Sequence, residues 1–181
     1  MLARNQHGKV GDQFVFRNRN GKSFTSNIPK LSTKPPKSGQ VSQRNKFRLA
    51  AKYGNKVKDD PGLSEMYQVQ ATQQGTSVYQ VAVTDFLKAP VINEIKIAKY
   101  KGKIGDMILI DAYDDFMVNS VRLVINDSNG QLVEEGDCLL ADDKMYWVYT
   151  ATCEIADLNG VAINALAEDL PGNIGNLEIT L

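Results

Sequence analysis

The sequence has few of the residues that catalysis uses and no hydrophobic run of the length that a membrane requires. Its 181 residues include one His, two Cys and one Trp. No apolar run approaches the roughly 20 residues that cross a bilayer, and the N-terminus lacks the roughly 7 to 15 apolar residues of a secretory signal. No pattern fixes a location, and a cytoplasmic or virion-like protein is the default expectation.

The cysteines and the histidine cannot form a structural zinc site within one chain, because Cys138 and Cys153 lie outside any Cys-x-x-Cys pattern. A hairpin that turns at residues 141–144 would place Cys138 opposite Trp147. Cys153 would then lie about 20 Å along the ladder, too far for a disulfide, so we expect two reduced packing residues. His7 has no positioned partner to make it a general base. We predict no catalytic residue, no enzyme activity and no cofactor.

Acids are nearly absent from the first third of the chain, and bases are nearly absent from its C-terminal part. Residues 1–58 contain 14 Lys or Arg and one acid, a net charge of +13. Residues 104–181 contain two bases and 15 acids, a net charge of −13, while residues 59–103 balance with five of each. The formal net charge of zero is therefore a cancellation. Such asymmetry indicates a polyanionic partner or complementation between the two ends.

Two candidate interaction surfaces follow from this distribution. The candidate basic surface comprises Arg17, Arg19, Lys22, Arg44, Arg48, Lys52 and Lys56. The candidate acidic surface comprises Asp111, Asp114, Asp115, Asp142 and Asp143. Like charges four residues apart on a helix repel by a few tenths of a kcal/mol, so a partner or water should face the basic stripe. We predict a protein partner or self-association, with nucleic acid as the alternative and no membrane or small-molecule substrate.

The N-terminal pattern predicts a hairpin, an arm and three helices. Asn20-Gly21 separates β-prone runs at 13–17 and 23–27, which is a strong hairpin signal. The prolines of residues 29–40 indicate an extended arm. Apolar residues at helical spacing predict a helix from Val41, broken by Asp60-Pro61-Gly62, and further helices over 63–74 and 78–87.

After Pro90 the hydrophobic period changes to two, as in strands. Seven short runs separated by turn residues follow, over 91–97, 107–113, 118–125, 131–140, 145–153, 161–166 and 177–181. About seven strands in about 100 residues is the pattern of an immunoglobulin-like sandwich. A lipocalin-like barrel is disfavoured because these short strands leave little room for a cavity.

The segments that carry a resemblance are Gly105-Asp-Met-Ile-Leu-Ile-Asp-Ala-Tyr-Asp-Asp, Trp147-Val-Tyr-Thr-Ala-Thr and the turn from Ala167 to Asn173, which fits Ala-x-Asp-x-x-Gly-Asn. Residues 90–181 resemble bacterial immunoglobulin-like modules, which implies a fold and a spacer or binding role. The basic front end, with Gly8-Lys-Val-Gly and Gln43-Arg-Asn-Lys-Phe, is similar to the start of uncharacterised Bacteroidetes-type proteins, a family that carries no function to transfer.

Two further groups have a functional and a structural interpretation. Turn acids at the ends of such a sandwich could supply oxygen ligands to Ca2+. They are Asp111, Asp114, Asp115, Asp127 with Asn129, and Asp169 with Asn173. Their spacing matches no EF-hand loop, and we favour solvated turn acids. Trp147 and Tyr149 share one face of their strand, which we expect to be the core and not a ligand platform.

The sequence thus predicts an α+β protein of two domains: a basic hairpin, arm and helical domain at 1–89 and an acidic immunoglobulin-like sandwich at 90–181. The predicted function is a non-enzymatic structural or protein-interaction module whose basic and acidic halves assemble. The alternative is a nucleic-acid-binding protein that uses the hairpin and the first helix. An enzyme, the third class, would need a pocket of convergent acids.

Overall fold

The computed structural model describes residues 7–19, 22–28 and 35–181, which divide into two compact units with the boundary between Val41 and Ser42. The boundary predicted at residue 90 lies inside the second unit, where the helices and the sheets share contacts. Within the described residues, no helix combines the length and the apolar character needed to span a membrane.

The first unit is a three-stranded antiparallel sheet in the order β1 (Gly8–Val10), β2 (Phe14–Arg19), β3 (Lys22–Asn27). The predicted hairpin is confirmed, because β2 pairs with β3 up to Arg19 and Lys22. Its turn residues, 20–21, lie outside the described residues, as do residues 29–34 of the predicted arm. Strand β1 was not expected, since a three-residue strand leaves little signal in the sequence.

The three predicted helices are α1 (Ser38–Asp59), α2 (Pro61–Gln74) and α3 (Val78–Leu87), and all but the first turn of α1 belongs to the second unit. Helix α1 begins before the expected residue 41, because the Gln40 side chain accepts a hydrogen bond from the Lys37 amide (3.0 Å) and holds the first turn. The last three residues of the predicted arm are therefore helical. Asp60 caps α2 by accepting from two backbone amides, and Gly75 ends it with a left-handed φ of 60°.

The helices pack around a small core of their own. Its buried members are Val57, Tyr67, Ala71, Val81 and Ala82. Phe116 and Leu170 pack against this core from the turns that join β5 to β6 and β10 to β11, so the helical core continues into one end of the sheets.

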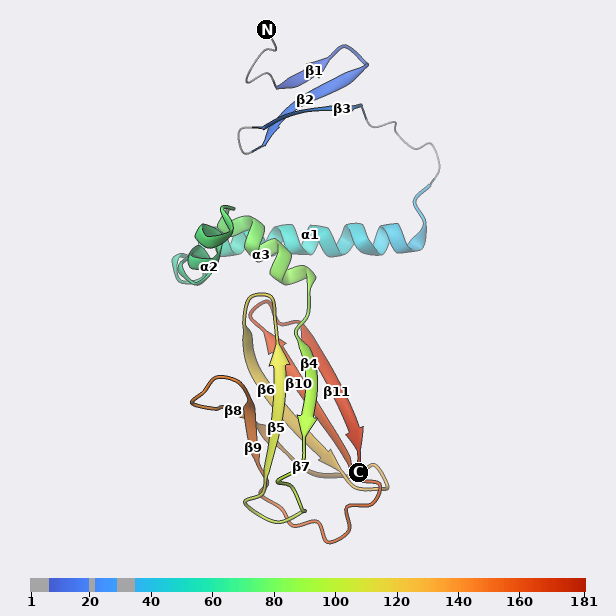
Figure 1. Ribbon diagram of the computed structural model, residues 1–181. Helices are drawn as coiled ribbons and strands as arrows, with labels where there is room; N and C mark the ends of the chain where they lie inside the picture. Colours follow the sequence, from blue (N-terminus) through green and yellow to red (C-terminus); the bar gives the residue numbers. More distant parts are fainter. Residues whose placement is uncertain (1–6, 20–21, 29–34) are drawn as a thin grey trace. The chain divides into compact units, whose positions relative to one another are not determined.

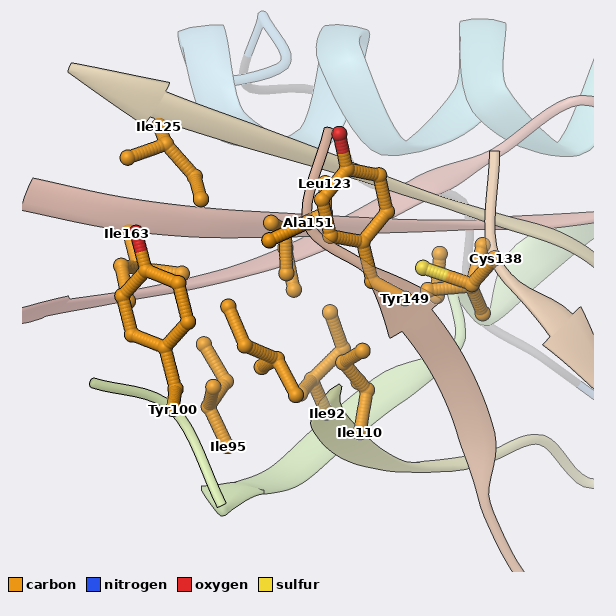
Figure 2. Packing of buried hydrophobic residues seen from close by; sticks show 14 of the residues in the cluster. Ile92, Ile95, Tyr100, Ile110, Leu123, Ile125, Cys138, Tyr149, Ala151 and Ile163 are labelled. Carbon is orange, nitrogen blue, oxygen red and sulfur yellow. The ribbon is translucent and has the colours of Figure 1, made fainter. Parts of the chain in front are cut away.

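Two four-stranded antiparallel sheets form the rest of the second unit (Figure 1). The order in one sheet is β4 (Val91–Lys96), β5 (Met107–Tyr113), β9 (Trp147–Thr150), β8 (Leu139–Leu140). The order in the other sheet is β11 (Ile174–Thr180), β10 (Ala162–Asp169), β6 (Val118–Asn126), β7 (Leu132–Asp137). The sheets share one core, to which Ile110 and Leu123 contribute from opposite sheets (Figure 2). Tyr149 and Trp147 pack in it, as expected.

The strand predicted over 131–140 is wrong in one respect, because it is two strands in different sheets. Strand β7 pairs with β6, and β8 pairs with β9. Cys138 lies between them, buried, with its amide donating to Val121 (2.7 Å). The hairpin register is also corrected: Leu140, and not Cys138, lies opposite Trp147. Both cysteines are free thiols, as predicted.

Gly54 allows α1 and α3 to approach closely. A Cβ at this position would lie 2.8 Å from Tyr79 Cδ2 and from Val83 Cγ2. We expect Gly54→Ala to lower the free energy of unfolding by up to about 2 kcal/mol, because overpacking costs about 1–3 kcal/mol and the gain in helix propensity offsets only about 1 kcal/mol of it. Urea unfolding measures this change.

The matched control is Gly39→Ala in the exposed first turn of the same helix, where a Cβ would meet nothing within 4 Å. We expect this variant to be unchanged or to gain up to about 1 kcal/mol. Equal effects of the two substitutions would contradict the close packing of α1 on α3.

Candidate functional site

An aspartate occupies the buried face of helix α3. Asp85 lies one turn after Val81 on that face and is 3% exposed. The Tyr67 hydroxyl of helix α2 donates to its Oδ2 atom. Tyr67 is fixed in turn by stacking on Phe116 with ring centroids 4.1 Å apart, and its hydroxyl lies 3.0 Å from that of Tyr53 in α1. The three helices and the β5–β6 turn therefore all hold this carboxyl in place.

Two carboxylates from the sheets meet Asp85 at the same point. Asp114 belongs to the β5–β6 turn and Asp169 ends β10. One ligand oxygen of each of the three side chains lies within 4.8 Å of the other two. We call Asp85, Asp114 and Asp169 the carboxylate cluster. It joins the helices to the end of the two sheets.

Hydrogen bonds fix the two sheet carboxylates in position. Asp114 Oδ2 accepts from the backbone amides of Phe116 (2.9 Å) and Met117 (3.0 Å). Asp169 accepts from the amide (2.6 Å) and from Nδ2 (2.7 Å) of Asn173. Asn173 Nδ2 also donates to the carbonyl oxygen of Lys88 (3.1 Å) just after α3. The β10–β11 turn thus ties the end of α3 to the sheets.

The electrostatics of the cluster are unfavourable for three ionised acids. Burial raises the pKa of Asp85 to about 7; the hydrogen bond from Tyr67 opposes this shift, while Asp114 and Asp169 add to it. Burial likewise raises the pKa of Asp169, against the hydrogen bonds from Asn173. Among the described residues, no Lys or Arg forms an ion pair with the cluster. The nearby Lys88 forms its ion pair with Asp115 instead.

A hollow of about 330 Å³ opens beside the cluster. It is lined by Gln70, Gln74, Val81, Thr84, Asp85, Tyr113, Asp115 and Phe116. Asp85 is both a cluster residue and a lining residue, so the hollow leads from solvent toward the buried carboxyl.

The candidate basic surface is divided between the two units. Arg17 and Lys22 are exposed on the hairpin, and Arg19 ends β2. Arg44, Arg48, Lys52 and Lys56 are exposed along α1 at every fourth residue. Within the part of the chain that the structure describes, none of the four α1 cations forms an ion pair.

Helix α1 is packed over only part of its length. Its buried residues are Ala50, Gly54 and Val57. Every residue from 38 to 49, which we call the free half of α1, is exposed. This half includes Phe47, which is 52% exposed, and Leu49, which is 46% exposed. Within the described residues, two of its side chains form hydrogen bonds: Lys46 donates to the Leu87 carbonyl oxygen (2.9 Å), and Gln40 accepts from the Lys37 amide (3.0 Å).

The candidate acidic surface is not brought together as one set. Asp114 belongs to the carboxylate cluster, and Asp115 pairs with Lys88. Asp142 and Asp143 are exposed in the turn between β8 and β9. Asp111 lies half-buried on β5. Within this candidate set, the exposed acids that form no ion pair among the described residues are therefore Asp142 and Asp143.

The sequence predicts Asp114 and Asp169 at one end of a sandwich, but no pattern singles out Asp85. The available signal was the position of this acid within the apolar stripe of its helix, four residues after Val81. An ionisable side chain at a core position of a helix needs a partner. The aspartates of the two turns supply the surroundings that no local pattern reveals.

Comparisons with protein-family models, with curated proteins and with solved structures found no match to this chain. The geometry of its own residues therefore carries the functional argument.

The hydrogen bond from Tyr67 to Asp85 gives a testable prediction. We expect Tyr67→Phe to lower the free energy of unfolding by about 1–3 kcal/mol, because it leaves a buried carboxyl oxygen without its donor. Urea unfolding measures the loss. Tyr53→Phe is the comparison, with an expected loss of about 0.5–1.5 kcal/mol, because among the described residues the Tyr53 hydroxyl forms a hydrogen bond with Tyr67 alone. A larger loss for Tyr53→Phe would contradict this arrangement.

Proposed function

We propose that the protein is a non-enzymatic structural or protein-interaction module that assembles through its basic and acidic parts. Copies meet when the free half of α1 and the basic hairpin contact the acidic sandwich of a neighbouring copy. The exposure of an entire cationic half-helix is the observation that carries this proposal.

The order of the strands supports an immunoglobulin-like sandwich as the acidic part. In that fold one sheet has the order A-B-E-D and the other has C-F-G. Taking β4 as A and β5 as B makes β4-β5-β9-β8 the A-B-E-D sheet, and β11-β10-β6 then corresponds to G-F-C. Strand β7 is the added C′ strand. The fold indicates a spacer or binding role and no reaction.

The free half of α1 supports a partner-binding role for the basic part. A helix of about 12 residues is marginal in water by itself, and most helix stability in proteins comes from packing one apolar face. The free half has no buried residue, although Phe47 and Leu49 are exposed on it. A partner that covers these side chains would supply the missing packing, with Arg44 and Arg48 available for acidic contacts.

Charge complementarity supports a second copy as the partner. Residues 1–58 carry +13 and residues 104–181 carry −13. Complementary potentials steer association and fix its register. A contact between different surfaces of identical copies is heterologous, and it gives a ring or a filament. Asp142 and Asp143 are exposed acids that such a contact can use.

Nucleic acid remains the alternative partner, favoured by the regular spacing of the four exposed α1 cations. Each phosphate contact would release counterions and steepen the salt dependence of binding. The exposed hairpin cations Arg17 and Lys22 would supply further phosphate contacts.

Sedimentation velocity of the full-length protein tests the assembly. At ionic strengths of about 0.01 M and about 1 M, where charges are screened over about 30 Å and 3 Å, we expect multimers and monomers respectively. The combined variant Arg44→Glu, Arg48→Glu, Lys52→Glu should be monomeric in both conditions. Its control is Lys99→Glu, Lys101→Glu, Lys103→Glu, which makes the same charge change at exposed positions of the β4–β5 loop.

The control variant should assemble like the unmodified protein. A variant with Asp142→Lys and Asp143→Lys should lose self-association and should bind the α1 charge-reversal variant when the two are mixed. A protein that is monomeric at both ionic strengths contradicts the assembly. If that monomer binds a labelled duplex at low salt and the α1 variant does not, nucleic acid is its partner.

A further inference from the structure

We propose that Asp85, Asp114 and Asp169 bind a Ca2+ ion that holds the three helices against the end of the two sheets. Of these residues, Asp114 also belongs to the candidate acidic surface. The inference does not depend on the proposed assembly.

The three carboxylates come from elements far apart in the sequence and converge at one point. A ligand oxygen from helix α3, from the β5–β6 turn and from the end of β10 lies within 4.8 Å of the other two. Asp85 is 3% exposed and Asp169 is 1% exposed. Burying several carboxylates together costs several kcal/mol per ion unless opposite charge compensates them. Lys88, the nearby cation, is engaged by Asp115 at the surface.

An unpartnered atom points to a ligand. The Tyr67 hydroxyl donates a hydrogen bond to Oδ2 of Asp85. Within the described residues, no donor reaches the buried Oδ1 atom of Asp85. The same carboxyl contacts that of Asp114. At this contact one acceptor faces another, so either a proton or a cation must lie between the two carboxyl groups. A cation bound by both carboxylates fills this place without protonating either one.

The donor set selects the kind of cation. All the charged ligands of the cluster are carboxylate oxygens, which suit Ca2+, Mg2+ and Mn2+ and not the softer metals that prefer His or Cys. Ca2+ accepts irregular coordination, whereas Mg2+ demands near-octahedral geometry and keeps several waters. Hydrogen bonds already fix Asp114 and Asp169, and two of the three carboxylates are buried. These constraints favour Ca2+.

The hollow beside Asp85 gives the ion a path from solvent. Once bound, the ion would link α3 to the β5–β6 and β10–β11 turns by direct coordination. Because the folded protein alone brings the three carboxylates together, Ca2+ should stabilise the fold against unfolding.

Calorimetric titration of the EDTA-treated full-length protein with CaCl2, together with thermal unfolding, tests the proposal. We expect one bound Ca2+ per chain. At a Ca2+ concentration 100 times the Kd, Tm should rise by roughly 5–10 °C. Tb3+ gives a second readout, since Tyr67 lies at the cluster and should sensitise its emission. Excess Ca2+ should displace Tb3+, and Tyr67→Phe should reduce the sensitised emission.

Two matched variants separate a metal site from a structural effect. Asp85→Asn keeps an acceptor for Tyr67 and removes a charge, so it should fold with an unchanged or higher Tm in EDTA and should lose the Ca2+ response. Asp157→Asn makes the same chemical change at an exposed turn and should keep the full response.

Absence of a heat of binding, of a Tm shift and of Tb3+ emission in the unmodified protein at millimolar concentrations would overturn the proposal, and the cluster would then be neutralised by a proton. Retention of the full Ca2+ response by Asp85→Asn would overturn it as well, because the ion would then bind elsewhere. Equal loss of the response in Asp157→Asn would also contradict the assigned site.

Discussion

The buried carboxyl of Asp85 is the constraint on which the arrangement of helices and sheets depends. Helix α3 places this carboxyl in the protein interior at the end of the sheets, where two more carboxylates lie. Like charges in such a place are tolerated only with hydrogen bonds and a compensating charge. Tyr67, Asn173 and backbone amides provide the hydrogen bonds, and they belong to helix α2 and to the turns between strands. Fixing one carboxyl therefore orders several elements at once.

This junction also determines which part of α1 would be presented in the proposed assembly. The C-terminal half of α1 packs through Ala50, Gly54 and Val57 on the helices that the junction holds. The other half of α1 then continues beyond them as an exposed, cationic helix. A helix anchored at one end presents its side chains in a fixed arrangement, which reduces the ordering cost of binding. The stability of the junction and the proposed assembly are thus connected through a single helix.

Much of the fold could be predicted from the sequence, because local signals determine it. The bounds of α3 follow from Ser77, Pro90 and the helical spacing of the apolar residues between them. Those of β5 follow from the alternation of apolar and polar residues along the strand. The division of one predicted strand into β7 and β8 could not be predicted, since alternation continues while the chain changes sheets at Cys138. The convergence of three aspartates, the first and last of which are 84 residues apart, could not be predicted either, because it depends on tertiary packing. Charge asymmetry was visible at once, whereas the separation of the acidic residues into a buried and an exposed group needed the structure.

The central claim is that the free half of α1 binds another copy of the chain, and amide hydrogen exchange tests it most directly. Exchange is compared at low and at high ionic strength. We expect amides of residues 42–49 to be protected at low ionic strength, where copies associate, and to exchange rapidly at high ionic strength. Amides of residues 50–59, which pack within the chain, should stay protected in both conditions. Equal exchange of residues 42–49 at the two ionic strengths would contradict the account.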